Sequence, residues 1–125
     1  MSLDVYLNSK PKIVECKCDT CGHVHQIESR DVVFNWNITH NLGEMAEAAK
    51  LYDALWRPEN LNITVASELI PILTKGLDEL ECFPETYSKF NPTNGWGDYK
   101  GFVKFVKEYL QACIDNPEAE IEVCR

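Results

Sequence analysis

Residues 32–57, VVFNWNITHNLGEMAEAAKLYDALWR, change their hydrophobic period at one point. Over residues 32–38 every second side chain is large and apolar, which is the period of a strand with one buried face. From residue 42 the apolar side chains recur at helical spacing, which predicts a helix over about 42–57 that Pro58 closes. Asn41 and Glu44 have the spacing of a capping box at its start. This stretch therefore predicts a strand followed directly by a helix.

The same two patterns predict the elements on either side. Alternating residues predict strands near 3–7, 12–16, 24–28 and 119–124. Helical spacing covers about 65–81 and the segment from Phe102 to Cys113, and Pro84 suits the first turn of a short helix that ends near Phe90. Pro71 lies either close to the first turn of the 65–81 helix or at a kink.

The order of strands, helices and a last strand predicts an α+β fold. We expect a small, mainly antiparallel sheet with three to four helices packed on one face. The 125 residues have the length of one domain. Within it, residues 12–28 are expected to form an inserted hairpin.

The composition excludes several classes of protein. Twelve basic and 20 acidic residues give a net charge of −8, which opposes general binding to a phosphate backbone. The chain has no apolar run of membrane-spanning length and no signal-peptide pattern at its start. We therefore expect a cytoplasmic protein that binds neither membranes nor nucleic acid in general. The acidic charge would suit a basic protein partner.

Residues 16–25, CKCDTCGHVH, gather five possible metal ligands. Cys16, Cys18 and Cys21 with His23 or His25 would complete a four-coordinate structural zinc site of the knuckle type. Cysteine clusters in cytosolic proteins bind metals or act in catalysis more often than they form disulfides. The alternatives are free thiols at a polar hairpin tip and a redox pair.

A second group of polar residues lies where the strand passes into the helix. Asn37, Thr39, His40 and Asn41 surround a helix N-terminus, whose free N–H groups can bind an acceptor on a ligand. His40 can exchange a proton near neutral pH. The alternative is that these side chains only cap the helix and satisfy the backbone.

Two further segments supply binding-site material on loops. Arg57 lies at the end of the expected helix, and Asn94 and Trp96 lie in a loop rich in glycine and asparagine. A shared site would require these loops to meet the residues around His40.

Four motifs carry a resemblance that spans most of the chain: SLDVYL at 2–7, NITHNLGEMA at 37–46, LWRPE at 55–59 and NPTNGWG at 91–97. In this order they resemble a family of small proteins, without an assigned activity, that are common in bacteriophage and prophage genomes. The resemblance implies a phage-associated protein in the host cytoplasm. It also implies that the cysteine hairpin is an accessory, because the stretch between the first two motifs varies within the family.

These observations predict a small binding or interaction protein with a zinc-stapled hairpin and a polar site near residues 37–43. Its partner would be a protein or a small molecule. The alternative is a small enzyme in which His40 acts as general acid or base on a polar substrate.

Overall fold

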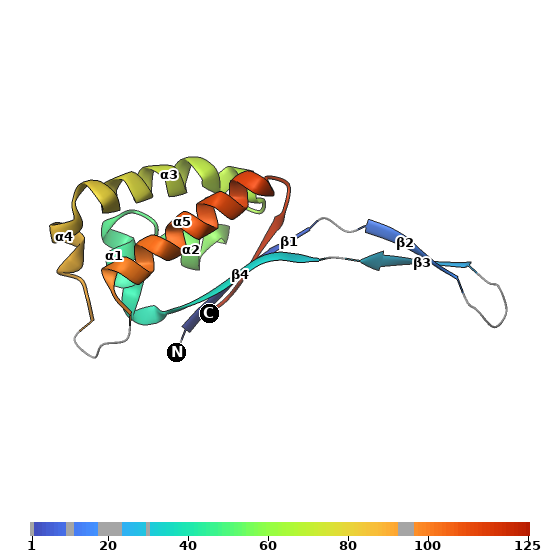
Figure 1. The fold of residues 1–125 in the computed structure, drawn as a ribbon, viewed down its shortest axis with the longest axis horizontal. Helices are drawn as coiled ribbons and strands as arrows, with labels where there is room; N and C mark the ends of the chain where they lie inside the picture. Colours follow the sequence, from blue (N-terminus) through green and yellow to red (C-terminus); the bar gives the residue numbers. More distant parts are fainter. Residues whose placement is uncertain (1, 10–11, 18–23, 30, 93–96) are drawn as a thin grey trace.

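The computed structural model describes residues 2–9, 12–17, 24–29, 31–92 and 97–125, with the backbone alone described for 12–17 and 24–29. Helices cover one face of a three-stranded sheet, and a two-stranded hairpin extends away from both (Figure 1). The expected α+β class is confirmed. The five strands are β1 (Ser2–Asn8), β2 (Lys12–Lys17), β3 (Val24–Ser29), β4 (Val32–Thr39) and β5 (Glu120–Cys124).

The main sheet is antiparallel and has β1 in its middle, in the order β4-β1-β5. Asp4 in β1 lies opposite Asn37 in β4 and Cys124 in β5. Leu3, Val5 and Leu7 are buried, and the residues between them are partly exposed. This alternation is what an antiparallel sheet shows when only one face is covered. We call the uncovered side the outer face.

Two long helices form most of the covering layer. They are α3 (Ala66–Cys82) and α5 (Tyr99–Asp115), which pack against each other over the sheet (Figure 1). The ring of Tyr109 in α5 stacks on Phe34 of β4, with centroids 5.3 Å apart. Burial raises the pKa of the Cys113 thiol to about 12, so this cysteine stays protonated at neutral pH. The predicted apolar stripe of α5 therefore forms core.

The helix expected over 42–57 is wrong in its continuity. The chain forms a 3-10 helix, η1 (His40–Leu42), then α1 (Gly43–Ala48) and α2 (Tyr52–Trp56). Lys50 between the two α-helices has φ 61°, a left-handed conformation that ends α1. The break turns Leu51 into the core beside Gly76 of α3. The helix count is accordingly slightly higher than expected.

The expected capping box is also replaced. Thr39, not Asn41, caps η1, because its Oγ1 accepts a hydrogen bond from the Asn41 backbone N–H at 3.2 Å. A 3-10 turn thus begins two residues before the expected helix, and the cap shifts back from residue 41 to residue 39.

The remaining helical segments follow their proline signals. Pro58 begins a 3-10 helix, η2 (Pro58–Leu61), and Pro84 begins α4 (Pro84–Ser88). Because α3 begins at Ala66, Pro71 lies in its second turn, and the helix continues through it to Cys82.

The inserted hairpin is a sheet of its own. Strands β2 and β3 pair only with each other among the described strands, and we call them the hairpin arm. At its root, the Ser9 backbone N–H donates to the Asp31 carbonyl at 2.7 Å, and the Asp31 N–H donates to Ser9 Oγ. The arm points away from the helical layer (Figure 1). The single mainly antiparallel sheet expected from the sequence is therefore divided in two.

Candidate functional site

His40 is held by a buried tryptophan. Its Nδ1 accepts a hydrogen bond of 2.8 Å from the Trp56 indole N–H, and the two rings lie 6.3 Å apart. Trp56 is only 2% exposed and stacks on Tyr52. The indole N–H can only donate, so His40 is the acceptor of this hydrogen bond. In this arrangement His40 fixes the junction between η1 and α2.

Asn37 makes its contacts on the outer face of the sheet. Its side-chain amide donates to Asp4 Oδ1 at 2.6 Å and to Ser2 Oγ at 2.9 Å, across the β1–β4 ladder. Ile38, the next residue, is buried on the opposite face. Asn37 is thus engaged with β1, and the described hydrogen bonds do not join it to His40.

Arg57 is exposed, and a different arginine binds beside it. One guanidinium nitrogen of Arg125 donates to the Trp56 carbonyl at 2.8 Å and to Glu59 Oε1 at 2.7 Å. The pKa of Glu59 is held below its usual value by a hydrogen bond from its own backbone and by Arg125. The sequence analysis missed Arg125 because it lies 66 residues from Glu59 and belongs to no motif.

The glycine-rich loop reaches the junction at its last residue. Gly97 has φ 91°, and a Cβ there would lie 2.7 Å from Cγ2 of Thr39. This close approach places the end of the loop against η1, as a shared site would require. Asn94 and Trp96 lie outside the described residues.

The arm brings two of the predicted metal ligands to one register position. Cys16 in β2 pairs with His25 in β3, one step before the last pair, Lys17 and Val24. Cys18, Cys21 and His23 lie outside the described residues. Elsewhere in the described part of the chain, no group of three His, Cys, Asp or Glu side chains could hold a metal ion. The backbone register places His25 opposite Cys16, and the metal site itself stays a prediction.

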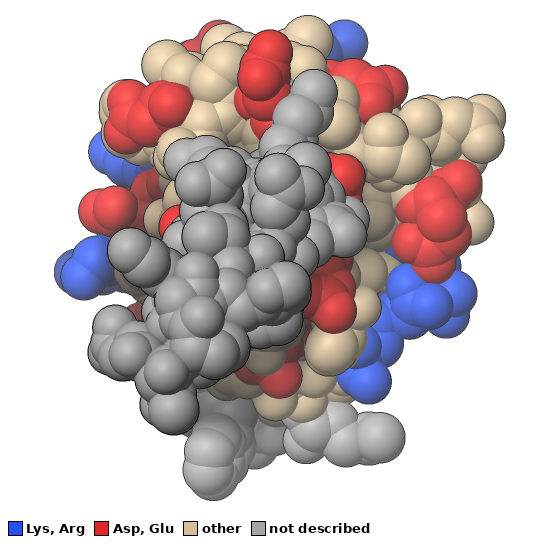
Figure 2. Space-filling view, turned by 90° about the vertical axis from the view of Figure 1, so that its right-hand side faces the viewer, with Lys and Arg blue, Asp and Glu red and all other residues tan. Residues whose placement is uncertain are grey.

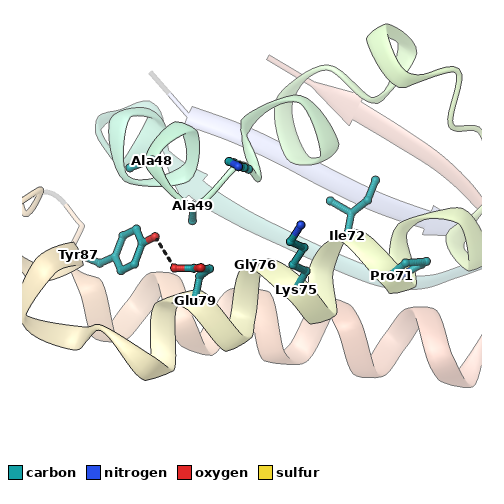
Figure 3. A pocket seen from close by; sticks show the side chains of 9 residues that line it. Ala48, Ala49, Pro71, Ile72, Lys75, Gly76, Glu79 and Tyr87 are labelled. Carbon is teal, nitrogen blue, oxygen red and sulfur yellow. Dashed lines mark hydrogen bonds between the residues drawn. The ribbon is translucent and has the colours of Figure 1, made fainter.

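A pocket that the sequence analysis missed lies between the α1–α2 turn, α3 and α4 (Figure 3). Its volume is about 420 Å³, and the Tyr87 hydroxyl donates to Glu79 Oε2 at 3.3 Å on its wall. We call it the Lys50–Lys75 pocket. It is lined by Ala48, Ala49, Lys50, Pro71, Ile72, Lys75, Gly76, Glu79 and Tyr87. No local motif marks it, because its residues come from three separate elements.

Comparison with known proteins assigns no family: no family model, curated protein or solved structure matches the chain. Among the described helices, none is long and apolar enough to cross a membrane.

Proposed function

We propose that the protein is a small binding protein that engages a partner protein through its hairpin arm and the outer face of its sheet. The observation that carries this proposal is the arm itself, which extends beyond the helical layer and pairs only within its own two strands in the described structure (Figure 1). We call the three-stranded sheet and its helices the body. A projecting element of this kind offers a surface for contact outside the body and adds nothing to its core. Contact with a partner would give it a role.

The arm also needs a source of stability. An isolated two-stranded hairpin is marginally stable at best in water. A zinc ion held by Cys16, Cys18, Cys21 and His25, or by His23 in place of His25, would supply this stability as a structural site. The pairing of Cys16 with His25 supports the assignment, because it joins one ligand from each strand at the same level.

The outer face has the character of a surface for a basic partner. It carries three carboxylates, that of Asp4 on β1 and those of Glu120 and Glu122 on β5. The negative charge of this face raises the pKa of Tyr6. The charge of Asp4 is the largest cause, followed by burial and then by the charges of Cys124 and Glu122. Several acidic side chains are also visible in the view from the right-hand end of Figure 1, beside a smaller number of basic ones (Figure 2). Charge complementarity of this kind steers a basic partner and favours its association.

The resemblance carried by the motifs at residues 2–7, 37–46, 55–59 and 91–97 is what supports a phage-associated role in the host cytoplasm within this proposal. The engagement of His40 with Trp56 and of Asn37 with Asp4 supports a structural task for both residues within a binding protein. The proposed activity is therefore recognition, with the junction around His40 as its scaffold.

Native mass spectrometry of protein expressed without added metal tests the zinc site. We expect an excess mass of one zinc per chain, which Cys18→Ser lowers and the control Cys82→Ser, at an exposed position of α3, leaves unchanged. Full zinc content in a variant lacking Cys16, Cys18 and Cys21 would overturn the assignment.

Titration with a lysine-rich peptide, followed by NMR, tests the partner surface. Shift changes should map to β1, β4 and β5, and Asp4→Asn with Glu122→Gln should weaken binding roughly fivefold at low salt. Glu108→Gln on α5 is the matched control. Equal weakening by the control, or shifts confined to the helices, would contradict the proposed surface.

A further inference from the structure

We propose that the Lys50–Lys75 pocket binds a small amphipathic monocarboxylate, with its carboxylate at the two ammonium groups and its apolar chain in the pocket. This ligand site is separate from the proposed partner surface, since the pocket lies among helices and the outer face lies across the sheet (Figures 1 and 3). Concave sites of about 300–1,000 Å³ with mostly apolar walls and a few polar groups are typical of small-molecule binding. At about 420 Å³, this pocket falls within that range.

The space exists because both walls carry small residues. Ala48 and Ala49 form the wall at the end of α1, and Gly76 lies on the α3 side. A Cβ at Gly76 would lie 2.3 Å from Leu51 Cδ2, so the glycine is required for the close approach of α3 to the α1–α2 turn. The left-handed backbone of Lys50 completes that turn. The walls are thus fixed by the packing of the core.

Two cations from different walls give the pocket its charge. Lys50 comes from the α1–α2 turn and Lys75 from α3, and Lys75 extends from its helix toward that turn (Figure 3). Neither ammonium has an ion-pair partner within 4.0 Å among the residues that the structure describes. In a chain of net charge −8, two such cations at an apolar pocket provide charge complementarity to an anion.

Glu79 restricts which anion fits. Its carboxylate accepts the hydrogen bond from Tyr87, whose side chain is 6% exposed. Burial, followed by the charge of Glu79, raises the pKa of Tyr87, so the hydroxyl keeps its proton and remains the donor. The remaining negative charge of Glu79 would repel a second carboxylate on a ligand. A single carboxylate on an apolar body therefore fits better than a dicarboxylate.

Octanoate is a suitable probe, used below its micelle concentration with the full-length chain and followed by NMR. We expect saturable shifts at the residues of the pocket. Lys50→Gln with Lys75→Gln should weaken binding roughly fivefold. The control Lys104→Gln, an exposed lysine on α5, should leave the affinity unchanged. Octylammonium, 1-octanol and the C8 dicarboxylate suberate should each bind more weakly than octanoate.

A second variant tests the pocket while both lysines remain. Ala48 is exposed and lines the pocket, so Ala48→Leu should fill the space without disturbing the core and should abolish the octanoate shifts. Three results would overturn the proposal: no saturable shift at millimolar octanoate, equal binding of 1-octanol, and full octanoate affinity in folded Ala48→Leu protein.

Discussion

The three-stranded sheet and the hairpin arm are built from adjoining segments of the chain, yet only the sheet has helices behind it. In β1 the inward side chains Leu3, Val5 and Leu7 are fully or almost fully buried. The arm has cross-strand hydrogen bonding of the same antiparallel kind but no helical layer. The comparison separates two contributions to strand stability. Pairing defines the register, and burial of apolar surface provides most of the free energy.

Removing a buried side chain from β1 should produce the largest effect. Leu7 is 0% exposed, so Leu7→Ala should lower the free energy of unfolding by about 3 kcal/mol through lost burial and a cavity. Urea denaturation measures this change. Asn35→Ala, on the outer face, is the control and should change stability by less than about 0.5 kcal/mol. Equal losses from both variants would break the distinction between the two faces.

Gly76→Ala should be the next most damaging change. The added Cβ would lie 2.3 Å from the buried Leu51 side chain, so Leu51 or α3 must shift, at a cost of about 2 kcal/mol. Gly43→Ala is a matched control, because a Cβ there meets Tyr52 only at 3.7 Å and its backbone is already helical. Thermal unfolding of both variants compares a tight contact with an open one. A neutral Gly76→Ala would show that the helical layer adapts freely.

Tyr109→Phe should stabilise the body. The Tyr109 hydroxyl is buried with no hydrogen-bond partner among the described residues, and burial raises its pKa, which keeps it protonated. Removing an unsatisfied hydroxyl while keeping the ring stack on Phe34 should add about 1 kcal/mol to the free energy of unfolding. Chemical denaturation monitors the gain. A loss of stability would indicate that the hydroxyl has a partner in solution, such as a bound water.

Replacing the arm should have the smallest effect on the body. Because Ser9 and Asp31 are hydrogen-bonded at its root, an Asn-Gly turn in place of residues 10–30 should close the β1–β4 hairpin. We expect the free energy of unfolding of the body to stay within about 1 kcal/mol of the parent protein's value, since the core residues all remain. Circular dichroism checks that the shortened protein is folded, and urea denaturation measures its free energy of unfolding. Loss of folded body would mean that the arm supports the core after all.

The sequence predicted the strands closely because alternation reports the buried face of each strand locally. It did not predict that β2 and β3 form a separate sheet, because periodicity does not specify which strands pair. The helix expected over 42–57 is interrupted where Leu51 packs on Gly76, and this contact joins residues 25 positions apart. Tertiary packing therefore overrode a continuous helical pattern.

The candidate sites were foreseen unevenly for the same reason. Motifs drew attention to His40 and Asn37, but their partners Trp56 and Asp4 depend on the fold. Arg125 and the Lys50–Lys75 pocket had no local signal, because a single arginine and scattered alanines acquire meaning only through distant neighbours. The predicted zinc ligands of the tip remain a prediction, supported by the register of Cys16 and His25.

The central place of β1 has a kinetic consequence. Its pairs with β4 join nearby parts of the chain, but its pair with β5 brings Asp4 to Cys124. Contacts between residues so distant in sequence close slowly, because the entropy of a long loop must be lost before the contact stabilises the chain. The arm, by contrast, is a local hairpin of a type that forms in about 1–10 μs. We therefore expect docking of β5 to be the late step in refolding.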